Sequence, residues 1–449
     1  MRAGPRPARI FSKSAGAAVA IMLTAASSSA LAQAPAPPAV AAAATAAAVR
    51  AERIEDFYRA RGGRPLFTAS PTAVQQLLVL LNSAAIDGLD PRRYQYQRLT
   101  KALDETRSGK PRALNAAEWL LAQAFVTYAS DLRRAPNVGI IYVDRTLMPD
   151  APTPRALLEG AAAAPMLDSY IASMGWMNPI YVQLRRALDS GAYKDPLQYR
   201  SLALNLQRAR TLPAGPGRYI VVNAAAQRLD TFERGKLVDS MKVVVGKTKN
   251  PTPMMAAYIR FASLNPYWNV PPDLAAERIA PNVLKEGLGY LKFKGYQVLS
   301  DWGDSPSVVD PKTIDWKGVA AGRVDIRVRQ LPGPSNAMGQ MKFMFPNSEG
   351  IYLHDTPEKE KLAEASRLFS GGCIRLEDAP RLGAWLFDQP LTPAAAGTEE
   401  RVPLNQPVPV YVTYLTAIPS GSEITFIDDI YGRDAARTAQ TDPSAVASR

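Results

Sequence analysis

The hydrophobic pattern of this chain changes its period at one point, the cluster of residues 213–217 (PAGPG). Before this cluster, apolar residues recur three and four positions apart, as at Val74, Leu77, Leu78 and Leu81, which is the spacing of one helix face. After it, runs rich in β-branched and aromatic residues alternate with turn residues, which is typical of strands. We therefore predict an α+β chain, with an α-helical N-terminal scaffold followed by a mostly β domain.

Local patterns predict where the elements begin and end. Ser70 is a suitable helix N-cap because Pro71 follows it, and Glu118 occupies a capping-box position three residues after Asn115. Asp378 with Pro380 marks a further helix start. The predicted helices cover residues 71–87, 115–135, 181–188, 199–210 and 379–387, and residues 356–369 also have helical propensity. The predicted strands cover residues 219–222, 228–232, 237–245, 256–264, 341–345, 351–353, 408–415 and 424–427.

Residues 266–335 interrupt the β part with little regular pattern and many Pro and Trp residues. An insertion of this length in a compact domain is usually a lid or a binding loop. A small helical subdomain with its own aromatic core explains the composition equally well, and the two interpretations are compatible.

The N-terminus has the pattern of a secretory signal over residues 1–32, with a basic start, an apolar stretch and the small-residue cleavage site Ala30-Leu31-Ala32. An Ala/Pro-rich linker follows over residues 33–50. We expect a helical scaffold domain over 51–212, a β domain over 213–433 and a disordered tail over 434–449. No later apolar run approaches the ~20 residues that cross a bilayer, so we expect an exported protein without a transmembrane span.

The chain is basic, with 53 Lys and Arg against 41 Asp and Glu. Removal of the signal takes away four basic residues and leaves a net charge of about +8. This bias favours anionic partners such as an acidic cell-wall polymer, and export argues against nucleic acid. Arg208 and Arg210 on the predicted fourth helix are interpreted as part of a solvated or interdomain face.

One histidine, His354, and one cysteine, Cys373, stand in the stretch 351–375. A single cysteine cannot form a disulfide within the chain, and this pair cannot build a zinc site, so we expect no metal. Either residue could fill a core. Alternatively, imidazole can take the thiol proton and the thiolate then attacks a carbonyl group. Gly371 and Gly372 before Cys373 favour this second interpretation, because they let backbone N–H groups of Gly372 and Cys373 approach an oxyanion.

The segments 352–356 (YLHDT) and 370–375 (SGGCIR) resemble the signature of the L,D-transpeptidase (YkuD-like) catalytic domain. Residues 265–271, 332–339 and 342–347 are similar to the large Gram-negative YcbB-like subfamily, and the resemblance runs from Phe57 to Asp434. The family more often has histidine where this chain has Gly371. Small residues also occur there in the subfamily, so we expect the site to be active. We find no separate peptidoglycan-binding module before residue 213.

The resemblance implies that residues 213–433 are the catalytic domain, that residues 266–335 cap the substrate, and that the protein is periplasmic. Its partners would be peptidoglycan stem peptides and other cell-wall synthases, with no cofactor. His354 would be the general base and Cys373 the nucleophile that attacks the stem at its third residue, a diamino acid, and releases D-Ala. The candidate substrate-binding residues are Arg375, Tyr352, Ser370, Asn336 and Trp268.

Several alternatives stay open at this point. Arg375 could instead form an internal salt bridge, and either Asp355 or a backbone carbonyl could orient His354. The acceptor could be an amine of a neighbouring stem, which gives a 3→3 crosslink, or water, a D-amino acid or a protein amine. A non-catalytic wall-binding protein is a further alternative. The sequence does not decide the oligomeric state or whether the helical part is a docking module or a scaffold.

Overall fold

The computed structural model describes residues 53–393, 395, 397–421 and 423–441. The predicted signal peptide over 1–32, the predicted linker over 33–50 and the last eight residues of the predicted tail lie outside these ranges. Within the described residues, no helix is both long enough and apolar enough to cross a membrane.

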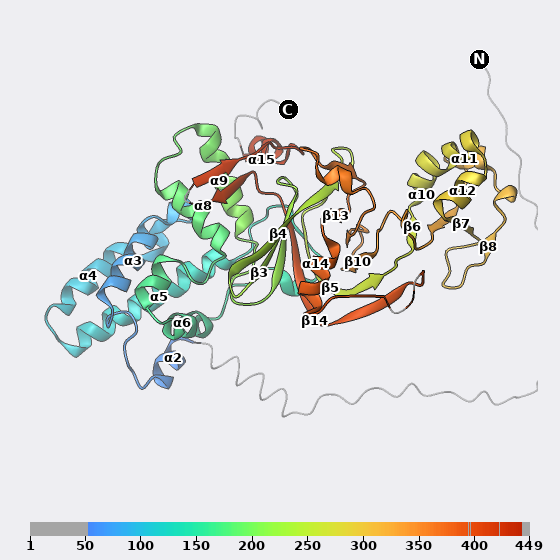
Figure 1. The fold of residues 1–449 in the computed structure, drawn as a ribbon. Coiled ribbons are helices and arrows are strands. Elements are labelled where there is room, and N and C mark those ends of the chain that lie inside the picture. Colours follow the sequence, from blue (N-terminus) through green and yellow to red (C-terminus); the bar gives the residue numbers. More distant parts are fainter. Residues whose placement is uncertain (1–52, 394, 396, 422, 442–449) are drawn as a thin grey trace, which may run out of the picture. The chain divides into compact units, whose positions relative to one another are not determined.

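The N-terminal part is helical, as predicted (Figure 1). Four of its helices begin with a side-chain N-cap followed by a proline in the first turn. Proline suits this position because its missing N–H would have no hydrogen-bond partner within the helix. The N-cap residues are Ser70, Thr153, Asn178 and Asp195. Trp176 packs edge-on against Phe125 with ring centroids 5.1 Å apart. The helices are α2 Ile54–Ala60, α3 Pro71–Asn82, α4 Tyr96–Thr106, α5 Pro111–Arg133, α6 Pro154–Ala163, α7 Leu167–Ala172, α8 Pro179–Asp189 and α9 Pro196–Ala209.

The predicted start of the second helix at Asn115 is wrong, because α5 begins at Pro111. Proline fits the first helical turn, so four more residues join the helix. Glu118 is therefore not a capping residue. Its buried carboxylate accepts the backbone N–H groups of Leu66, Phe67 and Thr68, at 2.7, 3.0 and 2.8 Å. This carboxylate ties the loop before α3 to α5.

The second part is a ten-stranded sheet in the order β1-β5-β10-β11-β13-β4-β3-β2-β14, with β12 paired to β4. Strand β14 pairs with both β2 and β5, which closes the sheet on itself. Apolar side chains such as Val243, Phe343 and Leu353 fill the interior. The strands are β1 Ile141–Tyr142, β2 Tyr219–Asn223, β3 Arg228–Glu233, β4 Lys236–Gly246, β5 Met255–Leu264, β10 Met341–Met344, β11 Leu353–His354, β12 Leu368–Ser370, β13 Ile374–Leu376 and β14 Glu400–Thr413.

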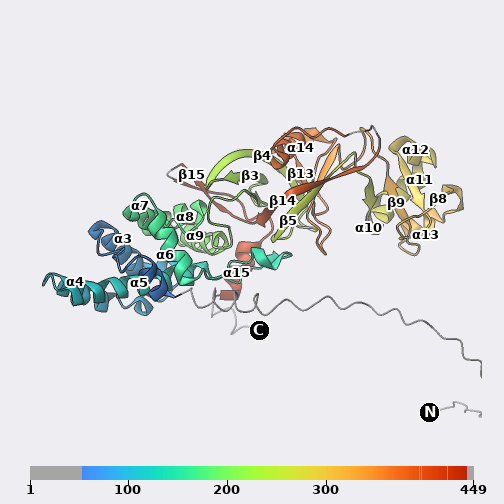
Figure 2. The ribbon, with the colours of Figure 1, turned by 90° about the horizontal axis from the view of Figure 1, so that it is seen from below.

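The insertion, residues 266–335, is a small subdomain (Figure 2) with its own core. A separate subdomain agrees with one of the two interpretations, but it combines short helices with a four-stranded sheet instead of being helical, and the buried core residues described there are mainly aliphatic, with Trp316 as the aromatic one. Its strands were not predicted, because each has at most four residues and alternation cannot be read over so short a run. They form the sheet β6-β9-β7-β8, and Trp316 and Val328 are buried beside it. The elements are β6 Trp268–Val270, α10 Pro272–Leu274, the π-helical turn Ala275–Ile279, α11 Ala280–Glu286, α12 Gly289–Lys294, β7 Tyr296–Leu299, β8 Val308–Val309, α13 Trp316–Ala320 and β9 Arg327–Gln330.

The helical propensity of residues 356–369 did not produce a helix there. Only the short 3-10 turn Lys359–Leu362 forms, and β12 begins at Leu368. The reason is tertiary: the Arg367 side chain donates to the carbonyls of Val243 and Gln227, which draws this segment onto the sheet. Helix α14, Ala379–Phe387, forms with Asp378 as its cap, as predicted.

The C-terminal segment also differs from the prediction. Strands β15 Ala417–Ser420 and β16 Glu423–Phe426 pair with each other and pack on the helical part, where Phe426 meets Tyr193. The tail predicted to be disordered from residue 434 begins instead as helix α15, Arg433–Thr441. Asp429 stabilises its start by accepting the N–H groups of Asp434 and Ala435.

Candidate active site

Strand pairing brings the histidine and the cysteine into one region. Strands β11 and β13 run parallel, with Leu353 opposite Ile374 and His354 opposite Arg375. Directly paired residues share a face of the sheet, and side chains alternate along each strand. Cys373 directly precedes β13, so this alternation places its side chain on the face of His354. The opposite face of the sheet, which carries Leu353 and Ile374, faces the apolar core.

A backbone carbonyl orients the His354 imidazole. Its Nδ1 atom lies 2.6 Å from the carbonyl oxygen of Asp355, and because a carbonyl only accepts, Nδ1 carries the proton. The Nε2 atom therefore has a free lone pair. The Asp355 carboxylate is used elsewhere, since it accepts the Gln340 N–H and the Lys359 ammonium, at 2.9 and 2.8 Å. This resolves the choice that the sequence left open.

Burial is the main cause that lowers the pKa of His354 from its ordinary 6.5 to about 3, and the nearby Arg375 guanidinium contributes to the same shift. The imidazole is 2% exposed. Between pH 3 and pH 6.5 the unfolded chain would bind a proton that the folded chain does not bind. The contribution of His354 to stability is therefore fully present above pH 6.5 and is lost as the pH falls through this window.

We expect nuclear magnetic resonance of the imidazole to show no titration between pH 5 and pH 8. The assignment is direct, because His354 is the only histidine of the sequence. Urea unfolding should show that stability decreases below pH 6.5 in the wild type, and that part of this decrease disappears in His354→Gln. A titration midpoint near pH 6.5 in the folded protein would contradict the buried, neutral imidazole.

Cys373 is half-buried, and its Sγ atom lies 3.5 Å from the carbonyl oxygen of Gly350. Its hydrogen bond goes to this carbonyl and not to the imidazole. Burial raises the pKa of the Cys373 thiol, while Tyr352 and Arg375 act in the opposite direction. Burial likewise raises the pKa of Tyr352, and the adjacent thiol adds to this shift. The site therefore favours a neutral Cys373 thiol and a neutral His354 imidazole.

The loop before Cys373 is held from within. The Ser370 hydroxyl donates to the Cys373 carbonyl at 2.6 Å and accepts the Gly372 N–H at 3.1 Å. Ser370, predicted to bind substrate, is buried and braces the loop. The Gly372 N–H, predicted to bind an oxyanion, is bonded to the Ser370 hydroxyl in this state. The Cys373 N–H is the remaining oxyanion-hole candidate of the two.

The two glycines of this loop differ in what they require. Gly372 has a φ of +125°, and a Cβ atom there would lie 3.1 Å from the Ile351 side chain. Gly371 is exposed, has no left-handed φ, and would place a Cβ atom in open space. A larger side chain therefore fits at residue 371, where the family more often has histidine. Glycine is required by the backbone only at residue 372.

The four remaining candidates are placed as follows. Arg375 forms an ion pair with Glu358 at 2.5 Å, so the internal salt bridge is correct and the guanidinium is engaged. Asn336, predicted to contact substrate, is fully buried; it donates to the carbonyls of Pro266 and Leu331 and accepts the Met338 N–H. Trp268 packs at the edge of the insertion core. Tyr352 stands beside His354 with ring centroids 5.6 Å apart.

Two domain models match the chain. One, described as the L,D-transpeptidase catalytic domain (YkuD), matches residues 217–410, and the other, described as a Scaffold domain, matches residues 52–188. Residues 217–410 are an L,D-transpeptidase catalytic domain. This confirms the resemblance seen in the sequence, and the pair of domains is consistent with the YcbB-like subfamily.

A curated protein of Haemophilus influenzae named "Putative L,D-transpeptidase" is 32% identical over 278 residues, which are 60% of this chain and 55% of the relative. The chain thus spans about half the length of that relative. Among solved structures, an L,D-transpeptidase from Mycobacterium smegmatis is 15% identical and covers 44% of this chain and 60% of its own, with a TM-score of 0.22. The structure of LD transpeptidase LdtMt1 in complex with imipenem is also 15% identical, with coverages of 44% and 59% and a TM-score of 0.21.

The L,D-transpeptidase domain has a support behind its cysteine loop that sequence reasoning missed. The buried Thr252 hydroxyl donates to the Gly372 carbonyl at 2.7 Å and accepts the Gly246 N–H at 2.9 Å. Tyr431 donates to the Gly246 carbonyl at 2.6 Å. Thr252 lies about 120 residues before the Cys373 loop and belongs to no recognisable sequence motif, so only the fold reveals that it supports this loop.

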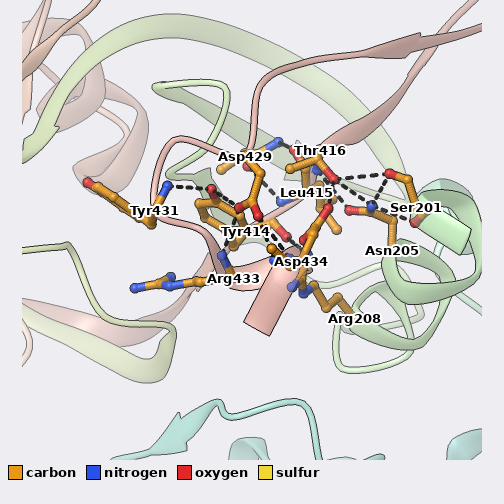
Figure 3. A network of polar contacts seen from close by, with 12 residues as sticks. Ser201, Asn205, Arg208, Tyr414, Leu415, Thr416, Asp429, Tyr431, Arg433 and Asp434 are labelled. Atoms are coloured by element: carbon orange, nitrogen blue, oxygen red, sulfur yellow. Dashed lines mark hydrogen bonds and ion pairs between the residues drawn. The ribbon is translucent and has the colours of Figure 1, made fainter. Parts of the chain in front are cut away.

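Tyr431 connects this support to a larger polar network (Figure 3). Its N–H group donates to the Tyr414 hydroxyl, which donates to Asp429 at 2.6 Å. Arg208 on α9 contacts the Tyr414 carbonyl at 3.0 Å and the Asp434 carboxylate at 2.5 Å. Of the two predicted environments, solvated or interdomain, Arg208 therefore has the interdomain one. The prediction does not hold for Arg210, which is buried within the helical part and donates to the carbonyls of Leu132 and Asp131. Within the ranges that the structure describes, no group of three or more potential metal-ligand side chains is arranged around a common point.

Proposed function

We propose that this chain is a peptidoglycan L,D-transpeptidase with Cys373 as its nucleophile and His354 as its base. The observation that carries the proposal is the proton position on His354. Since Nδ1–H is held by the Asp355 carbonyl, Nε2 is free to take the thiol proton. The chain has one cysteine and one histidine, and both belong to the catalytic domain that the family model matches.

The proposed reaction has two steps. The Cys373 sulfur attacks the carbonyl that joins the diamino acid at position three of a stem to D-Ala at position four, while His354 takes the thiol proton. D-Ala leaves with that proton, and a thioester remains. An amine of a neighbouring stem then attacks the thioester, loses a proton to His354 and forms a 3→3 crosslink, and Cys373 recovers its proton. The Cys373 N–H would stabilise the oxyanion in both steps.

The neutral resting pair is consistent with a base that acts only when substrate is bound. Apo catalytic hydrogen bonds are often long and shorten in the substrate complex. In this proposal the Cys373 thiol gives up its hydrogen bond to the Gly350 carbonyl when the substrate enters, and it donates to Nε2 of His354 instead. Tyr352 lies beside both groups and would close one side of the site. The insertion would cap the other side.

The decisive experiment is incubation of the full chain with defined tetrapeptide muropeptides, followed by mass spectrometry. Dimers joined between two diamino acids are the expected product. Tripeptides alone would assign an L,D-carboxypeptidase, and stems with an exchanged fourth residue would assign amino-acid exchange. Absence of any thioester with substrate or carbapenem would instead favour a non-catalytic wall-binding protein.

We further propose that the protein is exported to the periplasm through cleavage after residue 32, in keeping with a substrate outside the cytoplasm. N-terminal sequencing of the protein from the cell envelope tests this, and an intact Met1 would contradict it. The helical part would serve as the docking face for other cell-wall synthases, which cross-linking in whole cells can detect.

A further inference from the structure

A pocket of about 500 Å³ lies beside the candidate active site, and none of its residues takes part in the proposed acylation step. Strands β5, β10 and β14 form its floor, and the segments before β6 and β14 form its rim. Its lining combines apolar walls with charged and polar groups, namely Phe261, Ser263, Tyr267, Lys342, Met344, Thr398, Glu399 and Arg401.

Strand register connects this pocket directly to the histidine. Arg401 is opposite Ser263, Ser263 is opposite Lys342, and Lys342 is opposite His354. Because paired residues share a face, these four side chains form one row across the sheet. Neighbouring strands are ~4.8 Å apart, so the Lys342 position is one strand from the proposed base. The row continues from His354 to Arg375 on β13, directly after the Cys373 loop.

The charges of the pocket match a single anion. The Lys342 ammonium lies 3.3 Å from the Glu399 carboxylate, which also accepts the Ser263 hydroxyl. Arg401 lies 3.7 Å from the centre of the Phe261 ring, which places its guanidinium at the pocket wall. Two cations and one carboxylate leave a net charge of +1. The Lys342 side chain is only 15% exposed, and a carboxylate bound beside it would be shielded from solvent screening.

We propose that this pocket is the acceptor subsite. It binds the carboxylate of the acceptor molecule that is attached to the same carbon atom as the attacking amine. This inference rests on the proposed transferase function. With the carboxylate between Lys342 and Arg401, the amine one carbon away would lie toward His354. The D-centre of a stem diamino acid has this chemistry, and so does a free D-amino acid. The apolar walls of Phe261, Tyr267 and Met344 would receive the attached methylene groups.

In the transfer step, the amine nitrogen bonds to the acyl carbon and the carbon–sulfur bond breaks. The amine proton goes to His354, and the Cys373 sulfur leaves as a thiolate that recovers a proton from the imidazolium. No other reactant is needed. Water lacks a carboxylate and would gain nothing from the pocket, so a pocket of this kind favours transfer over hydrolysis.

The test compares two acceptors, D-methionine and D-methioninamide, with one tetrapeptide donor and the full chain. The amine of the amide loses its proton more readily, so intrinsic reactivity favours the amide. We expect the wild type to prefer D-methionine nevertheless. Arg401→Gln and Lys342→Gln should each lower the ratio of acid to amide product about tenfold or more, which is the usual effect of losing one charged hydrogen bond. The ratio is independent of any change in the acylation rate.

Arg228→Gln is the matched control, because Arg228 is a half-exposed arginine on β3 that pairs with Asp230 and lies outside the pocket. It should keep the wild-type ratio. A wild type that acylates and transfers but does not prefer the acid, or pocket variants with an unchanged ratio, would overturn the subsite and leave the proposed function intact. Absence of acylation in the wild type would overturn the function itself.

A second arm distinguishes the two sources of the carboxylate. It uses tripeptide stems whose D-centre carboxyl is either free or amidated, and it measures crosslinked dimers. If the pocket serves stem acceptors, free stems should be preferred by the wild type and the preference should fall in Arg401→Gln. If that preference is absent while D-methionine is still preferred over its amide, the pocket serves free D-amino acids.

Discussion

Cys373→Ala should abolish release of D-Ala from tetrapeptide stems, with a loss of about a thousandfold or more in rate. The reason is that the sequence has no second thiol to replace the nucleophile, and water alone cannot form the thioester. The measurement is D-Ala release together with the mass of the intact protein after incubation with a carbapenem. The wild type should gain one adduct mass and the variant none.

Gly371→Ala is the matched control in the same loop. A Cβ atom at residue 371 meets nothing within 4 Å, and the glycine has no left-handed φ, so this variant should acylate within a few-fold of the wild-type rate. Gly371→His would additionally test whether the more common residue of the family improves the site. Release of D-Ala by Cys373→Ala at the wild-type rate would rule out the covalent mechanism.

Asp87→Ala should destabilise the helical part by about 3–5 kcal/mol, the usual cost of leaving one partner of a buried ion pair alone. The Asp87 side chain is fully buried, and its carboxylate accepts the Arg185 guanidinium at 2.8 Å and the Tyr128 hydroxyl at 2.7 Å. The Tyr181 hydroxyl donates to the same carboxylate. Without Asp87, the buried Arg185 charge would be uncompensated. Urea unfolding followed by tryptophan fluorescence measures the loss.

Asp104→Ala is the matched control, because Asp104 is 70% exposed and pairs with the exposed Arg107. It should change the free energy of unfolding by about 0.5 kcal/mol or less. The double variant Asp87→Ala with Arg185→Met should recover part of the lost stability, since it removes the uncompensated charge. Equal losses for Asp87→Ala and Asp104→Ala would show that the buried pair is not the main contribution.

Much of the fold could be predicted from local patterns. The change from helical to strand periodicity, the proline-flanked caps of α3 and α14, and strands β2 to β5, β10, β11, β14 and β16 are local properties of short windows. The predictions failed where distant partners decide. Arg367 holds residues 356–369 on the sheet by donating to the carbonyls of Val243 and Gln227, and Asp434 in the first turn of α15 pairs with Arg208 of α9. These partners lie more than 100 residues away in the sequence, outside the window from which each segment was predicted.

The candidate site divides in the same way. The sequence by itself determined which residues have the necessary chemistry, because there is one thiol and one imidazole, and it determined the catalytic domain through the segments around them. Only the tertiary structure decided how these groups are arranged: the Asp355 carbonyl fixes the proton on Nδ1 of His354, the Ser370 hydroxyl accepts the Gly372 N–H, and the strand register places Lys342 and Arg401 in one row with His354. The physical reason is that residue type sets what a group can do, whereas hydrogen-bond partners, burial and register arise from contacts between segments far apart in the chain.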